Sequence, residues 1–480
     1  MAFPDVEQKR QKRVAIVGSG MAGLVTAYLL NQDEQQRYAV TLFENGKTLS
    51  FDAASVSIPS LTSTGCFDRV DLPMRAFAGG YYQKLKDLYD HLGLQYRVQL
   101  FHFAFSQLPP YPSSFRDSTS TPYFIHSSNN HRFPPLKPSG MPTGLWLARI
   151  FYLFFSYVYF TFCCMLIRPR SESLTETLGD YLTRIRISEE FKTHYILPLI
   201  SSVTTCPHAE LLQFPAIDVI NYKIMTHGKQ HYTVVNGVGD VQEILAKGIE
   251  TRFSTHVLSV SPQTSHTIKL QWRHTEDRNN LAISIEEFDN VVMAVSPDIV
   301  GNIFATLKDK MSRIPTVRVE SHVHADVIDD QGNSFMLRKT LGGSNTNIGG
   351  AQSIFLRTSM SGSSERRTES IHVQPSGVLV TTCPIMPIDT NRVIQSSTFT
   401  RVLRTPESRQ IVNELFQEEF HEDGELEGMG INEKLCPKWR NGDDGVWLVG
   451  SWCWDGMVLL EGCIVSAIRV AKGLGVEVPF

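Results

Sequence analysis

The chain has few cysteines, and their spacing excludes two common roles. Eight cysteines are spread over 480 residues, and no two of them form a C-x-x-C pair. Disulfide-stapled domains and structural zinc sites depend on closely and regularly spaced cysteines. We therefore expect reduced thiols in an intracellular protein, with no disulfide framework and no metal site.

The chain carries little net charge, and we expect no secretory leader. The 45 Lys and Arg side chains nearly balance the 49 Asp and Glu side chains, which leaves a net charge of -4. This balance offers no broad attraction to nucleic acid, so we expect no nucleic-acid partner. The amino-terminal residues are polar, and we expect a cytoplasmic protein. With 42% hydrophobic and 20% charged residues, the chain has the composition of a globular protein of two or three domains.

The most informative stretch that is present is a glycine-rich turn near the amino terminus. Val14 to Val17 is an apolar, β-branched run typical of a buried parallel strand, and an apolar helix is predicted from Leu24 to Leu30. Between them, Gly18, Gly20 and Gly23 form the pattern G-x-G-x-x-G. The first glycine makes a tight turn, the second lets the backbone approach a pyrophosphate, and the third lets the helix pack closely on the strand. The amino terminus of such a helix attracts phosphate.

An acid stands where a dinucleotide site requires one. Tyr38 to Phe43 predicts a second strand, and Glu44 follows it, about twenty residues after the last glycine. A carboxylate at this place accepts hydrogen bonds from a ribose diol, which favours FAD or NAD over NADP. The alternative is an ordinary glycine turn followed by a surface glutamate, and it requires strand, glycines, helix and acid to be in register by chance.

Later segments return to the same domain after a long insertion. Tyr232 to Asp240 predicts a strand that enters an N-G-x-G-D turn, and Asp289 to Pro297 predicts another buried strand. Val446 to Val449 predicts a last parallel strand, which ends in Gly450-Ser451 and leads to a helix that opens near Glu461. A small residue at Gly462 would let a flat ligand approach that helix. The alternative for the middle segment is a separate small α/β unit.

Between these motifs the pattern is less regular. We expect an amphipathic helix from Gly79 to Gly93, an irregular segment from Phe101 to Gly144, a helix capped by Ser173 or Thr175, a helical stretch from Phe191 to Leu212 broken at Pro198 and Pro207, and Gly/Ser-rich loops from Gln331 to Ser370.

One apolar run has no charged residue for eighteen positions. It spans residues 150–167, with Arg149 before it and Arg168 and Arg170 after it, and it is rich in Phe and Tyr. A single crossing of a bilayer would separate strands that must join one sheet, which disfavours a transmembrane span. Two alternatives remain open: a helix partly embedded in a membrane surface, and a buried helix that lines an apolar substrate pocket.

The joint pattern resembles the FAD-dependent amine oxidase and phytoene desaturase superfamily. It is most similar to bacterial and fungal FAD/NAD(P)-binding-domain oxidoreductases, on Thr175 to Leu182, Leu197-Pro198, Phe214 to Ala216 and Thr226 to Gly228. The resemblance implies FAD as the cofactor and, for fungal members, a tailoring role in secondary metabolism. It also implies a set of cofactor contacts: Gly18, Ser19, Gly20, Met21, Ala22, Gly23 and Glu44 at the ADP half, Val257 at the adenine, and Gly450, Ser451, Val458, Leu459 and Glu461 along the ribityl chain and flavin.

The predicted fold class is therefore α/β, with a discontinuous Rossmann-type FAD-binding domain and an inserted α+β substrate domain. We assign residues 1–80, 231–300 and 426–480 to the FAD-binding domain, and 81–230 and 301–425 to the substrate domain.

The chain departs from the superfamily at three places. The G-G-R turn after the ribose acid is missing, and Arg75 is the nearest candidate for a phosphate or flavin contact. Gly450-Ser451 stands where an acid often follows the glycine. No lysine matches the one that holds a water at flavin N5 in amine oxidases, so an amine substrate is not implied. His227 is the candidate we name for catalysis.

Three functions remain open at this point. The first is a flavoenzyme that oxidises a small organic substrate by hydride transfer to flavin N5. The second is a desaturase or isomerase of a lipophilic polyene or acyl chain, and the third is a dinucleotide-binding protein without catalysis. The sequence names neither the substrate, the electron acceptor, the catalytic base nor the oligomeric state.

Overall fold

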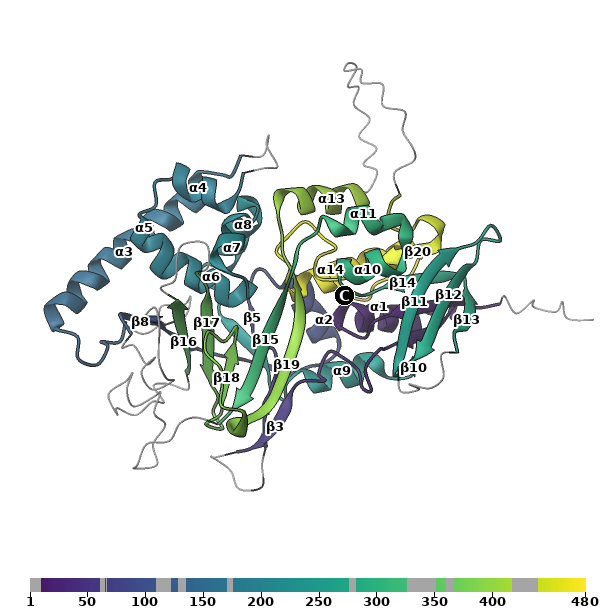
Figure 1. Ribbon diagram of the computed structural model, residues 1–480, viewed down its shortest axis with the longest axis horizontal. Helices are drawn as coiled ribbons and strands as arrows, with labels where there is room; N and C mark the ends of the chain where they lie inside the picture. The colour runs from purple at the N-terminus through teal and green to yellow at the C-terminus, as the bar shows by residue number, and fades with distance from the viewer. Residues whose placement is uncertain are drawn as a thin grey trace, which may run out of the picture.

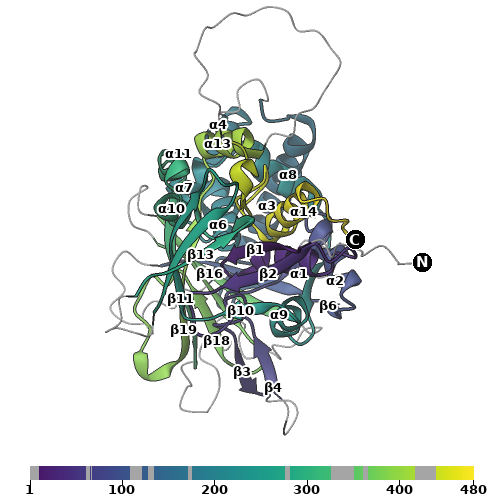
Figure 2. The same ribbon diagram turned by 90° about the vertical axis from the view of Figure 1, so that its right-hand side faces the viewer.

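The computed structural model shows an elongated molecule with two regions built around two different sheets (Figures 1 and 2). It describes residues 10–60, 65, 67–108, 122–127, 135–170, 176–275, 282–325, 351–359, 366–416 and 439–480.

The first region is organised by a five-stranded parallel sheet. Its strand order is β10-β2-β1-β14-β20, so the strands come from three stretches that are far apart in the sequence. This arrangement confirms the α/β fold class and the return of the chain to one Rossmann-type sheet, although the boundaries assigned to the domains stay a prediction. The strands are β1 (Lys12–Val17), β2 (Tyr38–Phe43), β10 (Glu250–Arg252), β14 (Asn290–Met293) and β20 (Val446–Leu448).

Both faces of this sheet are covered, which explains the unbroken apolar run of β1. Val14 and Ile16 pack into one core, while Ala15 and Val17 pack into another on the opposite face. The first face carries α1 (Met21–Asn31), α2 (Gln83–His91), α9 (Val238–Ala246) and α14 (Leu460–Gly473). The second carries β11 (Thr255–Pro262), β12 (Ile268–His274), β13 (Ser284–Phe288), α10 (Pro297–Ile303), α11 (Lys308–Ser312) and α13 (Pro406–Phe416).

The second region is built on a mixed seven-stranded sheet. The order is β19-β15-β18-β17-β16-β7-β8, in which β7 and β16 pair in parallel and the other neighbours are antiparallel. The strands are β7 (Phe101–Leu108), β8 (Phe124–Ser127), β15 (Thr316–His324), β16 (Gln352–Ser359), β17 (Thr368–Val373), β18 (Leu379–Thr382) and β19 (Val393–Val402).

Two expectations fail in this sheet. The segment that begins at Phe101 opens with a long strand, β7. This strand is buried along most of its length, and it pairs with β16 at one edge and with β8 at the other. The stretch from Gln331 to Ser370 contains β16 and the start of β17, although the rest of it lies mostly outside the described residues. In both cases a strand borders a Pro-, Ser- or Gly-rich stretch, and the composition of the whole region concealed it.

Helices α3 to α8 form a layer at the end of the molecule away from β11–β13 (Figure 1). The helix predicted over 150–167 is confirmed, although it starts earlier. The elements are α3 (Thr143–Leu166), α4 (Leu178–Arg184), α5 (Glu189–Phe191), a π-helical turn (Lys192–Ile196), α6 (Leu197–Thr204), α7 (His208–Leu212) and α8 (Ala216–Thr226).

Three helix boundaries correct the sequence-based expectation. Thr177 caps α4 in a reciprocal capping box with Asp180, whereas Ser173 and Thr175 lie outside the described residues. Pro198 does not break its helix, because it falls at the start of α6, directly after the π-helical turn. The helix predicted from Gly79 is shorter, since α2 begins only at Gln83.

The remaining strands form two small sheets. They are β3 (Val56–Pro59) with β4 (Phe67–Val70), and β9 (His231–Val234) between β5 (Phe77–Ala78) and β6 (Tyr96–Val98).

Candidate dinucleotide site

The three glycines after β1 have two different surroundings. A Cβ on Gly18 would lie 2.7 Å from the Ala294 carbonyl oxygen, and Gly18 has a φ of +103°. A Cβ on Gly23 would lie 2.1 Å from the Gly18 carbonyl oxygen. At Gly20 no atom lies within 4 Å of the added carbon. Gly18 and Gly23 are thus required by packing, whereas Gly20 borders open space at the amino terminus of α1, where a pyrophosphate would approach.

Glu44 is buried and organises this loop. Its Oε2 accepts hydrogen bonds from the Ser19 N–H, at 3.1 Å, and from the Ser19 hydroxyl, and its Oε1 accepts from the Gly46 N–H at 2.7 Å. The Ser19 hydroxyl also accepts from the Ser50 N–H at 2.8 Å. A carboxylate has about four acceptor sites, so one remains for a ribose hydroxyl.

Replacing Glu44 tests its role in cofactor binding. We expect Glu44→Ala to weaken FAD binding by about 1.5–3 kcal/mol, or roughly tenfold to a hundredfold, since a charged hydrogen-bond acceptor is lost. Glu44→Gln keeps one acceptor oxygen, so a smaller loss is expected. Calorimetric titration of the apoprotein with FAD measures both values. Equal affinity in the wild type and both variants would mean that Glu44 only shapes the loop.

The other residues predicted at the ADP half lie where the loop meets α1 and β2. Met21 and Ala22 are buried in the first turn of α1, and no side chain caps this turn, so their N–H groups face the amino-terminal end of the helix. Val257 lies on β11, just after the hydrogen bond that Thr255 N–H donates to the Glu44 carbonyl. The chain therefore brings Val257 to the carboxyl end of β2, beside the ribose acid.

Two partly enclosed arginines lie near α14 on the side of the substrate domain. Arg75 Nη2 donates to the Phe51 carbonyl at 3.4 Å, its guanidinium lies 4.9 Å from the centre of the Phe51 ring, and its Nε is buried without a hydrogen-bond partner. Arg401 donates to the carbonyls of Val203 and Thr204 at the end of α6. Both guanidinium groups act electrostatically on the Cys463 thiol.

These arginines fit an anionic ligand. Burial lowers the pKa of both groups from its ordinary value, because the charge is removed from water. Asp71 offsets the charge of Arg75, whereas no ion pair of Arg401 occurs among the described residues. Arg75 thus offers a free Nε–H, and Arg401 offers a positive charge without an ion pair among the described residues. Near the amino-terminal end of α14, both suit the phosphates or the electron-rich edge of a bound dinucleotide.

The carboxyl-terminal motif forms a tight turn between β20 and α14. Gly450 exchanges hydrogen bonds with the Ser466 hydroxyl, and Ser451 follows at the edge of this turn. Val458 and Leu459 are buried, and Leu459 is the N-cap residue of α14. These four predicted contacts lie together at the amino terminus of α14, where the helix dipole favours negative charge.

Gly462 is required by packing within the chain itself. A Cβ there would lie 2.4 Å from Trp454 Nε1 and 2.5 Å from the Ser451 carbonyl oxygen. The flat group that packs on this glycine is therefore the Trp454 indole of the chain itself, which accounts for the small residue without a ligand, and the approach of a ligand there stays a prediction. The sequence could not distinguish the two because both need a residue without a side chain.

Glu461 points away from the flavin side of the motif. Its carboxylate accepts hydrogen bonds from the N–H groups of Lys84 and Leu85, at 2.8 and 3.0 Å, in the first turn of α2. Burial raises the pKa of Glu461 to about 6, although both hydrogen bonds favour the ionised form. Glu461 thus caps a second helix from α14, and its predicted contact with the cofactor is left to its backbone.

Arg404 is a functional neighbour that sequence reasoning missed. Its fully buried guanidinium donates through Nη2 to the carbonyls of Trp452, Trp454 and Gly456, at 3.1, 2.7 and 3.2 Å. One side chain after β19 therefore holds the Trp-rich loop that precedes α14. No local signal marks it, since Leu-Arg-Thr-Pro is an ordinary exposed-turn sequence.

An aromatic cluster joins this loop to the substrate domain. Tyr81 lies at the centre, with ring centroids 5.3 Å from Tyr82, 4.8 Å from Tyr222 and 5.9 Å from Trp454. Tyr81 also accepts the Met457 N–H at 2.9 Å. Burial raises the pKa of Tyr222 to about 12, so the cluster is neutral at physiological pH.

His227 lies elsewhere on α8. It is exposed at the carboxyl end of that helix, with its Nδ1 3.0 Å from Lys223 Nζ. Tyr222, one turn earlier, is the residue of α8 that reaches Tyr81. A catalytic role for His227 stays a prediction.

Comparison with known proteins agrees with this geometry. Residues 16–92 match the family described as NAD(P)-binding Rossmann-like domain, and no curated protein matches the sequence. The CLA-producing fatty acid isomerase from P. acnes is 11% identical with a TM-score of 0.55, over 96% of this chain and 98% of that one. Cyclohexylamine oxidase from Brevibacterium oxydans IH-35A is 12% identical with a TM-score of 0.53, over 97% and 100%.

At these identities the likeness concerns the fold. The resemblance inferred from the motifs is confirmed at that level: residues 16–92 match an NAD(P)-binding Rossmann-like domain, and the fold of the whole chain is shared with the fatty acid isomerase and the cyclohexylamine oxidase.

Proposed function

We propose that the protein is an FAD-dependent oxidoreductase that oxidises a small organic substrate by hydride transfer to the flavin. The observation that carries the proposal is the open space at Gly20 beside the buried Glu44. Arg75, with its unpartnered Nε, and the amino terminus of α14 support the flavin half of the site. FAD, when bound, supplies a two-electron acceptor for hydride.

The chain's own residues orient the substrate and exclude water in this proposal. Tyr81, Tyr82 and Tyr222 present neutral aromatic surfaces between the dinucleotide-binding region and the substrate domain. Arg404 fixes the Trp-rich loop, which keeps Trp454 against Gly462 and holds the start of α14 in place. Such a rigid, dry surrounding favours hydride transfer over side reactions with water. A role in secondary metabolism belongs to this proposal and has no structural support of its own.

The purified protein is expected to be yellow and to release FAD when denatured. Cys453, the cysteine of the Trp-rich loop, is fully buried, and burial raises its thiol pKa well above the ordinary value, which disfavours a covalent flavin link. Absorbance of the supernatant after acid precipitation, followed by anaerobic reduction with a metabolite panel, tests both points. Flavin retained in the precipitate would contradict noncovalent binding. A chain that takes up no flavin after reconstitution would contradict the proposed cofactor.

A second candidate is an isomerase or desaturase of a lipophilic polyene or acyl chain. Two observations favour it: the fold is shared with a fatty acid isomerase, and helix α3 is long and apolar in composition. Substrate conversion without net consumption of an electron acceptor would identify an isomerase. Stoichiometric reduction of an acceptor would identify an oxidation, and a new carbon–carbon double bond in the product would then distinguish a desaturase from the first candidate. If no substrate reduces the bound flavin and no substrate is converted, the result would favour a dinucleotide-binding protein without catalysis.

A further inference from the structure

Helix α3 exposes a continuous apolar stripe. Exposed side chains recur along it at spacings of three and four residues, which places them on one face of the helix. Their exposed fractions reach 66% at Phe155 and 64% at Leu166. The stripe, which we call the outer stripe, consists of Leu147, Phe151, Phe154, Phe155, Val158, Phe162, Met165 and Leu166.

The opposite face of α3 is fixed to the protein. Leu153, Phe160 and the two adjacent cysteines 163 and 164 are buried in the main core, and the Tyr157 ring lies 4.8 Å from that of Phe191. Tyr159 donates its hydroxyl hydrogen to the Ile185 carbonyl at 2.8 Å. The inner face of α3 is therefore packed against the protein. A helix that lines a pocket would explain this inner face but not the exposed outer stripe.

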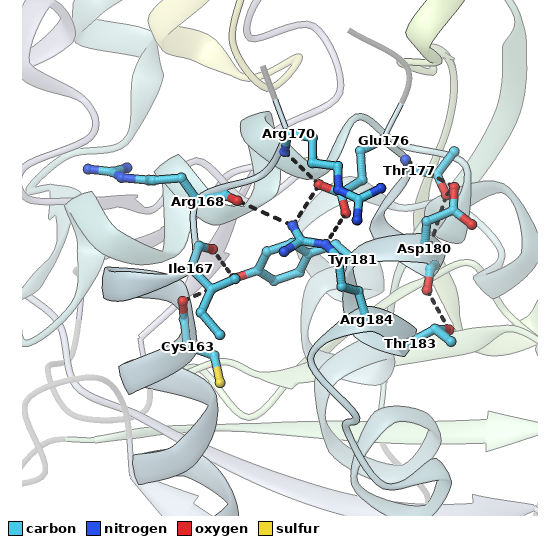
Figure 3. Close-up of polar contacts among 11 residues, drawn as sticks. Cys163, Ile167, Arg168, Arg170, Glu176, Thr177, Asp180, Tyr181, Thr183 and Arg184 are labelled. Carbon is cyan, nitrogen blue, oxygen red and sulfur yellow. Dashed lines mark hydrogen bonds and ion pairs between the residues drawn. The ribbon is translucent and has the colours of Figure 1, made fainter. Parts of the chain in front are cut away.

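The carboxyl-terminal end of α3 is held in place by a polar network (Figure 3). Tyr181 donates to the carbonyls of Cys163 and Ile167, at 3.2 and 2.9 Å. Arg184 pairs with Glu176 at 2.7 Å and donates to the Arg168 carbonyl at 3.2 Å. The network uses only the backbone of Arg168, whose side chain is exposed and extends away from it in Figure 3.

Three arginines border the outer stripe, and Glu176 is the carboxylate nearest to one of them, since it accepts the Arg170 N–H at 2.7 Å while it pairs with Arg184. Arg168, Arg170 and Arg186 are exposed, and none of them forms an ion pair among the described residues. Arg186 lies close enough to Tyr159 to affect its titration. The nearby acids Glu189 and Glu190 are already paired, with Lys192 and Arg149 respectively. Residues 143–170 contain no acid at all.

We propose that the outer stripe of α3 docks the protein on an anionic lipid bilayer, with the helix lying in the plane of the membrane surface. The helix is about 36 Å long, and its stripe runs along the whole length, so the face is suited to lie flat. Arginines at its border meet anionic headgroups, and the Phe and Tyr side chains suit the interfacial layer. A second copy of the chain fits less well, because its own residues 143–170 contain no acid that could pair with these arginines.

The placement of α3 agrees with this orientation. It lies at one extreme of the long axis of the molecule, while β11–β13 lie at the other (Figure 1). Of the described helices, α3 alone is long and apolar enough to span a bilayer by length and composition. Its inner-face packing against the protein core favours the surface orientation over a span.

Vesicle flotation of the full-length protein tests the proposal. The wild type is expected to float with vesicles of equal parts phosphatidylcholine and phosphatidylserine. A variant with Phe154→Ser, Phe155→Ser and Phe162→Ser is expected to lose binding by at least about tenfold, since three exposed rings no longer enter the interface. Phe160 is left unchanged because it is buried. The control carries Phe67→Ser, Ile283→Ser and Ile285→Ser, which are equally exposed at 67%, 54% and 54%, and it should bind like the wild type.

The electrostatic part has its own variant. Arg168→Gln with Arg170→Gln is expected to reduce binding to the mixed vesicles about tenfold and to leave weak binding to pure phosphatidylcholine unchanged. Unfolding midpoints confirm that each variant is folded. A wild type that floats with neither vesicle, or a serine variant that floats as well as the wild type, would overturn the proposal. Light scattering offers another contradicting result. If the wild type is a dimer and the serine variant is a monomer, a second copy of the chain covers the outer stripe instead of a membrane.

Discussion

Gly20→Val is expected to give a folded protein that has lost its dinucleotide. The backbone at Gly20 is extended, with a φ of -68° and a ψ of 177°, so valine fits the local conformation. Its side chain would fill the open space at the amino terminus of α1, where a pyrophosphate must come close to the backbone. We expect a loss of FAD affinity of at least about a hundredfold, or roughly 2.7 kcal/mol. Flavin content and titration of the apoprotein measure it.

Gly23→Ala is the matched comparison, because this variant should lose stability first, whereas Gly20→Val should lose only its dinucleotide. The added carbon would meet the Gly18 carbonyl oxygen at 2.1 Å, so the strand and helix must move apart. A lower unfolding temperature is expected here, with loss of flavin as a consequence. If Gly20→Val kept its flavin at wild-type affinity, the glycine loop would not be the pyrophosphate site, whatever Gly23→Ala does.

Arg357→Met is expected to lower the free energy of unfolding by about 3–5 kcal/mol. Arg357 on β16 is paired with Glu369 on β17, and the two side chains are only 3% and 1% exposed. Glu369 also accepts the Ile385 N–H at 2.9 Å. Without the arginine, an ionised carboxylate remains buried in the sheet without its cation, which is the costly state. Urea unfolding followed by circular dichroism gives the change.

Two further variants separate this effect from a general loss of an arginine. Arg357→Met with Glu369→Gln removes the buried charge and keeps an acceptor for Ile385, so most of the stability should return. Arg313→Met breaks an ion pair with Glu407 that is 51% and 57% exposed, and it should change stability by no more than about 1 kcal/mol. Equal losses in the buried and the exposed variant would contradict the argument.

Local patterns were sufficient to predict four of the five strands of the dinucleotide-binding sheet, all but β10. The strand predicted from Tyr232 was assigned to the same domain, but as β9 it pairs with β5 and β6 in a separate small sheet. The glycine turn, the apolar run before it and the acid after β2 each act within a few residues, so their sequence signal is direct. The segments that form β14 and β20 were recognisable because each is an apolar run that ends in a turn at the same edge of the sheet. For this reason the fold class and the position of Glu44 beside the glycine loop could be derived before the structure.

Contacts between distant segments could not be derived in the same way. From the sequence Glu461 is predicted to contact the flavin, whereas in the structure its carboxylate accepts hydrogen bonds from two N–H groups of α2. From the sequence Gly462 is predicted to make space for a ligand, whereas in the structure the Trp454 indole packs on it. The strand β7 begins with Phe at alternate positions, but its segment continues into a Pro- and Ser-rich stretch, and its pairing with β16 and β8 is not visible in the sequence. In each case the deciding partner lies far along the chain, and one sequence carries no record of it.

The order of strands in the parallel sheet has a consequence for synthesis. β1 lies between β2, which follows it closely, and β14, whose other neighbour β20 is made almost last. A ribosome adds roughly 5–20 residues per second, so the open edge of β1 waits on the order of 14–55 s for β14, and β20 follows only on the order of 20–90 s after β1. Until α14 has been made, Glu461 cannot cap α2. The glycine loop and the start of α14, which form the two ends of the proposed dinucleotide site, are therefore both present only when synthesis is nearly finished, and the early strands are prone to aggregation while they wait.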